Sequence, residues 1–292
     1  MKRLLALFVL CLTVLSCCGC QTAAAPAQVA ATTLPVYEFT QRLCQDTDIK
    51  VTRLVTENVS CLHDYSLSVR QVKAVESAQT VVLSGGGLED FLHDVLEDSA
   101  AIIDSAEGIS FHHCHDDHEE AGHRHVHETD PHIWLSPQHA MSMATKICRG
   151  LEISFPAHRE TFRKNLDSLL LDLAALESYG KQQLAGLSCR ELITFHDGFG
   201  YFAEAFDLTI LKAVEEESGS EASAAELKEL IHLVKNHALP AIFTEKNGSV
   251  SAAEIISRET GVSVFSLDMA MSGNSYFEAM YHNIHTVKEA LG

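Results

Sequence analysis

The sequence predicts an α/β protein of two lobes with mostly parallel sheets, joined by one long connecting helix. Three observations predict this fold. The chain has 292 residues, which suits two lobes of ordinary size. In both halves, short apolar runs alternate with helical patterns, as in βαβ units. Between the halves lies the longest helical pattern of the chain, over Pro156–Leu187.

The first half reads as four strands and two helices in alternation. Apolar runs bounded by polar residues predict strands over Gln28–Thr33, Ile49–Val55, Thr80–Ser84 and Ala101–Asp104. Helical spacing of apolar residues predicts helices over Ser68–Ala78 and Leu88–Leu96. Residues 106–131 break this pattern with clustered histidine and acid and little apolar content, so we expect a surface loop there.

The connecting helix is predicted by apolar residues at steps of three and four, from Phe162 to Leu187. Pro156 stands where a helix can begin. About thirty residues at 1.5 Å each span about 45 Å, the length of a two-lobed protein. The alternation then restarts, with strands over Glu191–Phe195, Leu208–Ala213, Ala241–Thr244 and Val262–Leu267, and helices over Tyr201–Phe206, Ala222–Asn236, Ser251–Thr260 and Ser275–Leu291.

The N-terminal segment is typical of an exported lipoprotein. Lys2 and Arg3 precede an apolar run over Leu4–Leu15 that is too short to span a bilayer. Gly19-Cys20 then resembles a lipoprotein cleavage site, at which Cys20 would carry the lipid; Cys18 is the alternative. The expected division is a signal peptide (1–19), a tether (20–27), an N-terminal lobe (28–150), the connecting helix (151–188) and a C-terminal lobe (189–292).

Charge and cysteine content exclude several classes of protein. The formal net charge is −19, which repels nucleic acid and attracts cations. The cysteines after the signal are Cys44, Cys61, Cys114, Cys148 and Cys189, without a CxxC pair, so a disulfide framework is not expected.

Histidine is the unusual residue of this chain. There are 17, and neutral imidazole is a common ligand of Zn²⁺. The loop over 106–131 is expected to collect metal ions weakly at many positions, because its histidines have no fixed spacing. These auxiliary residues are His112, His113, His115, His118, His123, His125 and His127. The alternative is a loop that is merely solvated or sensitive to pH.

Four residues outside that collection are candidates for one ordered metal site. His63 precedes a predicted helix, and His132 lies beside Trp134 where the loop returns to apolar chain. His196 and Asp268 each follow a predicted strand, at the carboxyl edge where α/β sheets bind ligands. Each residue alone can be structural, and Asp268 can instead cap the following segment. Together, in an acidic exported chain, they favour a metal site.

The residues around these candidates resemble a known family. The segments are His63-Asp64-Tyr65, Asp130-Pro131-His132-Ile133-Trp134-Leu135-Ser136-Pro137, Phe195-His196-Asp197-Gly198-Phe199-Gly200, and Asp268 after a late strand. The chain is similar, from about Gln28 to Leu291, to the zinc- and manganese-binding lipoproteins of ABC-type metal importers. The resemblance implies metal in a cleft between the lobes, with His63, His132, His196 and Asp268 as ligands. Asn274 is the alternative to Asp268, because the segment after that strand is short.

The resemblance also implies the cargo and the partners. Manganese members have a carboxylate at the position of His196, so histidine favours Zn(II) as the transported ligand. We expect a monomer held to the membrane by its N-terminal lipid, in the periplasm or at the cell surface. It would deliver zinc to the permease and ATPase subunits of an importer, with no nucleic acid as partner. The alternative function is a surface metal-dependent adhesin or a zinc-storage lipoprotein.

An enzyme is not expected. His127-Glu128-Thr129-Asp130-Pro131-His132 resembles the HExxH motif of zinc proteases but has one residue too many, and Pro131 would break the helix. The sequence contains neither a G-x-S-x-G motif nor a P-loop.

Overall fold

The computed structural model describes residues 28–58, 62, 65–96, 101–112, 129–214 and 222–292. Within them the strands form two parallel sheets, one in each lobe, with the orders β2-β1-β3-β4 and β6-β5-β7-β8. The first sheet contains β1 (Gln28–Ala31), β2 (Lys50–Arg53), β3 (Thr80–Leu83) and β4 (Ala101–Asp104). The second contains β5 (Glu191–Thr194), β6 (Thr209–Ala213), β7 (Ala241–Glu245) and β8 (Ser263–Leu267). The predicted fold class is confirmed.

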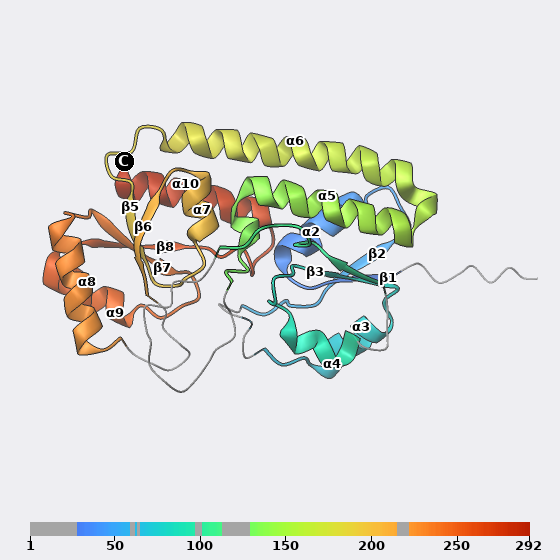
Figure 1. Cartoon of the computed structure of the whole chain (residues 1–292), viewed down its shortest axis with the longest axis horizontal. Helices are drawn as coiled ribbons and strands as arrows, with labels where there is room; N and C mark the ends of the chain where they lie inside the picture. The colour runs from blue at the N-terminus through green and yellow to red at the C-terminus, as the bar shows by residue number, and fades with distance from the viewer. Residues whose placement is uncertain (1–27, 59–61, 63–64, 97–100, 113–128, 215–221) are drawn as a thin grey trace, which may run out of the picture.

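Helices surround both sheets (Figure 1). The first lobe contains α2 (Leu34–Leu43), α3 (Val69–Glu76), α4 (His93–Leu96) and α5 (Pro137–Ser154), with 3₁₀ turns η2 (Asp90–Leu92) and η3 (Ile133–Leu135). The second contains α7 (Gly200–Ala205), α8 (Ala224–Asn236), α9 (Ser251–Thr260) and α10 (Tyr276–Leu291). In the described part of the chain, no helix combines the length and the apolar character that crossing a bilayer requires.

The long helix α6 (Arg159–Leu184) lies along both lobes (Figure 1). It packs on α2 and α5 of the first lobe and on α10 of the second. Its 26 residues span about 39 Å at 1.5 Å each. The helix begins three residues after Pro156, its predicted start, because Pro156 opens a separate 3₁₀ turn, η4 (Pro156–His158).

Three helical elements of the structure differ from those predicted from the sequence. The helices α2 and α5 were not predicted, although each begins with a proline in its first turn. The helix expected over Leu88–Leu96 is a 3₁₀ turn followed by the single turn α4. Glu89 explains why a regular helix does not begin here. Its carboxylate accepts hydrogen bonds from the backbone N–H groups of Ser84 and Gly85 and holds the chain in a turn.

One hydrophobic core continues from the first lobe into the second. It extends from Val29 in β1 to Leu291 in α10, and α6 contributes residues along its length. Polar contacts also join the lobes. The indole of Trp134 donates to the carbonyl of Met269 at 2.8 Å, and the hydroxyl of Tyr276 donates to the carbonyl of Trp134 at 2.8 Å. The lobes therefore share this core, while two smaller clusters, around Val81 and around Ile242, belong to one lobe each.

The segment after β8 is held by the first lobe. Arg53, at the end of β2, donates to the carbonyls of Met271 and Gly273 at 2.6 and 2.8 Å. Glu38 of α2 accepts from the backbone N–H of Tyr276 at 2.6 Å, at the first turn of α10. Because this segment follows Asp268 directly, its attachment to the first lobe fixes where that residue lies.

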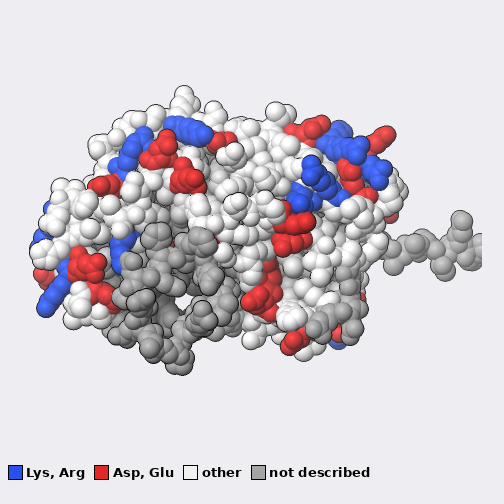
Figure 2. Space-filling view, viewed as in Figure 1, with Lys and Arg blue, Asp and Glu red and all other residues white. Residues whose placement is uncertain are grey.

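The surface charge is mixed on the face shown in Figure 2. Lys and Arg side chains lie beside Asp and Glu side chains over the upper part of that view. Charges of both signs therefore lie close together on this face, in a chain whose formal net charge is −19.

Candidate metal centre

His132 is held in one orientation by the turn that precedes it. It is buried just before η3, and the carboxylate of Asp130 accepts from its backbone N–H at 2.9 Å. The same oxygen lies 2.7 Å from Nδ1 of the His132 ring. Burial by itself raises the pKa of Asp130, but the hydrogen bonds and charge of His132 outweigh it and hold the pKa below its ordinary value. Because an ionised carboxylate only accepts, Nδ1 carries a proton, and in the neutral ring Nε2 therefore keeps its lone pair for a ligand.

His196 follows β5 at the carboxyl edge of the second sheet. Its Nδ1 lies 3.7 Å from Oε2 of Glu245, the last residue of the neighbouring strand β7. Burial, followed by the charge of Asp268, raises the pKa of Glu245 to about 8. The second sheet therefore brings a histidine and two acids to one edge, which is where the sequence argument placed ligands.

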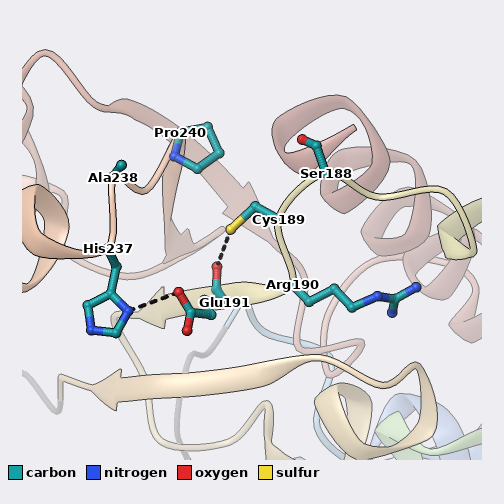
Figure 3. A pocket seen from close by; sticks show the side chains of 7 residues that line it. All are labelled: Ser188, Cys189, Arg190, Glu191, His237, Ala238 and Pro240. Atoms are coloured by element: carbon teal, nitrogen blue, oxygen red, sulfur yellow. Dashed lines mark hydrogen bonds and ion pairs between the residues drawn. The ribbon is translucent and has the colours of Figure 1, made fainter.

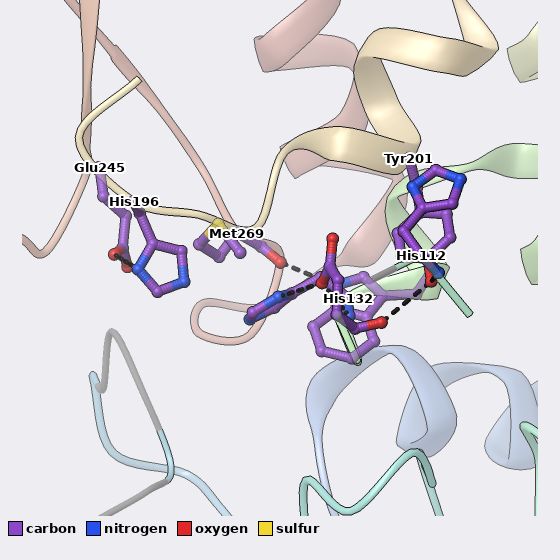
Figure 4. A network of polar contacts seen from close by, with 8 residues as sticks. His112, His132, His196, Tyr201, Glu245 and Met269 are labelled. Carbon is purple, nitrogen blue, oxygen red and sulfur yellow. Dashed lines mark hydrogen bonds and ion pairs between the residues drawn. The ribbon is translucent and has the colours of Figure 1, made fainter. Parts of the chain in front are cut away.

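The two predicted histidines meet across the lobes. The ring centroids of His132 and His196 are 5.1 Å apart, and the rings are inclined at 81°. Figure 4 shows His196 beside Glu245, with Met269 between that pair and His132. Gly198 makes the approach possible. A Cβ there would lie 2.8 Å from Nδ1 of His132 and 2.7 Å from Cε of Met269, distances that real Cβ atoms do not show.

Asp268 is buried and fixed by its neighbours. Its backbone N–H donates to the side-chain oxygen of Asn283, whose amide nitrogen donates back to the Asp268 carbonyl, both at 2.7 Å. One carboxylate oxygen, Oδ1, accepts from the backbone N–H of Ala270 at 2.8 Å. The other, Oδ2, lies 2.9 Å from the ammonium of Lys246. Asn274, the alternative to Asp268, lies exposed in the following loop.

Several predicted residues lie outside the described part of the chain. They are His63, His113, His115, His118, His123, His125, His127 and Cys20. Among the described residues, no three His, Cys, Asp or Glu side chains are grouped so as to hold a metal ion.

His112 is the described member of the auxiliary histidines. Its ring stacks on Tyr201, with centroids 4.2 Å apart, at one end of the network in Figure 4. Its Nε2 lies 3.0 Å from Oε2 of Glu204. The hydroxyl of Tyr201 donates to the carbonyl of Asp130, so this network leads to the turn that holds His132. His112 thus anchors one end of the histidine-rich segment beside the candidate site.

Three residues that surround the candidate ligands, Asp130, Glu245 and Lys246, were not identified from the sequence. Asp130 lay inside a quoted segment, but its role depends on a hydrogen bond that only the turn creates. Glu245 directly follows the strand predicted over Ala241–Thr244, as His196 and Asp268 follow theirs, so the same signal could have found it. Lys246 becomes relevant only because β7 pairs with β8 and places it opposite Asp268.

A surface pocket of about 460 Å³ lies in the second lobe, away from this edge. It is lined by Ser188, Cys189, Arg190, Glu191, His237, Ala238 and Pro240 (Figure 3). His237 lies 2.9 Å from a carboxylate oxygen of Glu191. These residues precede or begin β5 and β7, so the pocket is at the amino edge of the sheet, opposite His196 and Asp268.

The cysteines of the described residues are Cys44, Cys148 and Cys189, and all three are free thiols. Burial raises the pKa of Cys44 to about 12 and that of Cys148 to about 11. Both are therefore protonated at neutral pH, which makes them core residues rather than metal ligands.

Comparison with known proteins identifies the family. The family model "Zinc-uptake complex component A periplasmic" matches residues 29–290. A putative metal-binding protein of Treponema pallidum is 30% identical over 78% of this chain and 76% of its own length. The zinc-binding lipoprotein AdcA of Streptococcus pneumoniae is 29% identical over 99% of this chain, which spans 61% of AdcA.

The fold agrees with the same assignment. A crystal structure of ZnuA superposes with a TM-score of 0.81 at 29% identity, covering 92% of this chain and 100% of that one. The match therefore includes both lobes and the helix that joins them. From the sequence segments, the two parallel sheets and these similarities it follows that this chain belongs to the family of periplasmic components of zinc-uptake complexes.

Proposed function

We propose that this chain captures Zn²⁺ outside the cytoplasm and delivers it to the permease and ATPase of an ABC-type importer. The observation that carries the proposal is the meeting of His132 and His196, which come from different lobes and lie with ring centroids 5.1 Å apart. Two imidazoles that meet beside buried carboxyl groups form a donor set typical of zinc. The matching family model describes a zinc-uptake component, which favours import over adhesion or storage.

The proposed ligands are His63, His132, His196 and Asp268. Three neutral nitrogens and one carboxylate suit four-coordinate Zn²⁺, whereas Mn²⁺ prefers more oxygen ligands. Asp130 orients the His132 ring, which supports His132 as a metal ligand, because ligating histidines usually donate their other ring N–H to a carboxylate or carbonyl. A site closed by four protein ligands keeps no open position for catalysis, so we propose binding without turnover.

Calorimetric titration with Zn²⁺ tests this ligand set. The wild-type protein should bind one ion tightly, and His63→Ala, His132→Ala, His196→Ala and Asp268→Ala should each weaken that binding by at least about tenfold. His158→Ala is the matched control, since its ring pairs with Asp48 at 3.1 Å and it lies at the start of α6. Equal affinity in His132→Ala and wild type would refute the site.

The histidine-rich segment needs a separate test. Deleting residues 113–127 retains His112 on Tyr201 and should leave the single tight site intact, while removing weaker binding. If the deletion abolished tight binding instead, the loop would be the true site.

We also propose a lipid anchor at Cys20. AdcA, which is similar over almost the whole chain, is named a lipoprotein. Metabolic labelling with palmitate should mark the wild-type protein and the Cys18→Ala variant but not Cys20→Ala. Labelling that is lost in Cys18→Ala and kept in Cys20→Ala would move the anchor to Cys18.

A further inference from the structure

Lys246 is fixed opposite Asp268 by the pairing of two strands. In the β7–β8 register Glu245 pairs with Leu267. The residues that follow these two, Lys246 and Asp268, therefore lie opposite each other. The backbone N–H of Lys246 donates to the carbonyl of Leu267 at 2.9 Å, which continues the ladder beyond the sheet. The ammonium of Lys246 then lies 2.9 Å from Oδ2 of Asp268. The ion pair thus follows from backbone register and is not a chance surface contact.

The two oxygens of Asp268 differ in what holds them. Oδ1 accepts a hydrogen bond from the backbone N–H of Ala270, a donor that cannot turn away without moving the main chain. Oδ2 is held by Lys246, whose side chain can leave. A metal ion can bind Oδ2 without breaking the hydrogen bond from the Ala270 N–H, and Oδ2 is the oxygen that the ammonium contacts.

The exposures of the two partners show which of them moves. The side chain of Lys246 is 55% exposed, whereas that of Asp268 is 6% exposed. A lysine ammonium on a flexible stem can turn into water at little cost. The Asp268 carboxylate is held through its backbone by Asn283 and cannot follow it.

We infer that Lys246 competes with the metal ion for Asp268 and thereby sets how tightly the cleft holds its cargo and how fast it releases it. In the empty cleft the ammonium neutralises a buried carboxylate. When the ion binds, the ammonium loses its carboxylate partner, and the free energy of that ion pair is subtracted from the free energy of binding. When the ion leaves, the ammonium returns to Oδ2 and stabilises the empty form. Lys246 is thus a positioning residue that tunes affinity through Asp268. This inference rests on the proposed zinc function.

The test compares zinc binding by Lys246→Met and Lys246→Arg with binding by the wild type. Methionine retains the length of the stem and removes the charge, so Lys246→Met should bind Zn²⁺ about tenfold more tightly than the wild type. Most of this gain in affinity should appear as slower dissociation of Zn²⁺, measured by stopped flow with an excess of chelator. Lys246→Arg keeps a cation and should remain close to wild type.

Two controls separate this role from a general effect of charge. Lys181→Met removes an exposed ammonium that pairs with Glu177 on α6, and should leave the affinity unchanged. In an Asp268→Asn background, Lys246→Met should have no further effect, because the carboxylate through which Lys246 acts is gone. A far-UV circular dichroism spectrum of each metal-free variant equal to that of wild type shows that the fold is kept.

The outcomes distinguish the two proposals. If the wild-type protein lacks a tight zinc site, the proposed function fails. If it binds zinc tightly but Lys246→Met binds equally or more weakly, the competitor role is refuted while the function stands. A gain that persists undiminished in the Asp268→Asn background would also refute it, because the effect would not pass through Asp268.

Discussion

Nδ1 of the His132 ring lies 2.7 Å from Oδ1 of Asp130, and both residues are buried. The carboxylate thus fixes the ring and leaves Nε2 as its metal-binding atom. Asp130→Asn should weaken zinc binding by about 10- to 100-fold, because an amide can present an N–H to Nδ1 and favour the wrong tautomer. Titration calorimetry measures the change. An affinity unchanged from wild type would mean that Asp130 does not orient a ligand.

Gly198 allows His132, His196 and Met269 to approach one another. Gly198→Ala should reduce zinc affinity by about tenfold or more, since its Cβ would lie 2.8 Å from Nδ1 of His132 and push the two rings apart. Gly186→Ala is the matched control, because a Cβ there meets nothing within 4 Å. Competition with a fluorescent chelator reports both affinities, and equal values would show that the rings need not approach so closely.

His196→Glu should move the metal preference towards Mn²⁺. The substitution replaces a nitrogen ligand with oxygen, which suits a harder ion. Direct competition between Zn²⁺ and Mn²⁺, followed by metal analysis of the protein, measures the shift. A ratio of the two metals identical to that of wild type would count against His196 as a ligand.

Glu38 should give the metal-free protein a defined dependence on pH. Burial raises the pKa of Glu38 above 4.5, although the Tyr276 N–H, the Ser275 hydroxyl and Arg42 oppose the shift. A carboxyl group whose pKa is raised on folding stabilises the folded state below its unfolded pKa, and this contribution is lost as pH rises through the folded pKa.

Glu38→Gln removes that titration and keeps an oxygen for the N–H of Tyr276. The unfolding free energy of Glu38→Gln relative to wild type should therefore increase as pH rises from about 4, since the unfolded pKa of glutamate is about 4.3. Urea unfolding at a series of pH values provides the curve. A relative stability that falls with pH would show that the Glu38 carboxylate is stabilised on folding.

The elements that could be predicted from the sequence are those whose signals lie within one segment of the chain. The alternation of strand and helix and the spacing of leucines predicted both sheets and α6, because periodicity reports burial directly. The helices α2 and α5 were missed for different reasons. The ten residues of α2 continue an apolar run that already read as a strand. The signal of α5 was present in the sequence, because its buried residues recur at steps of three and four, as Ala140, Ala144, Ile147 and Leu151 do.

The candidate site was predictable only in part. His132 and His196 were identified from their contexts, and the structure brings them together. Their supporting contacts depend on which strands become neighbours. Glu245 meets His196 because β5 pairs with β7, and Lys246 meets Asp268 because β7 pairs with β8. No local pattern in one sequence encodes such pairings between strands.

The core that continues from Val29 to Leu291 has a consequence for unfolding. Two lobes with separate interiors can melt in separate transitions, but here Trp134 and Tyr276 lie buried where the lobes meet, and exposing either lobe would expose both. Scanning calorimetry should therefore record one cooperative transition, with calorimetric and van't Hoff enthalpies equal. An ion held in the cleft would then slow amide hydrogen exchange in strands far from it, such as β2 and β6, because those strands can open globally only when the whole molecule does.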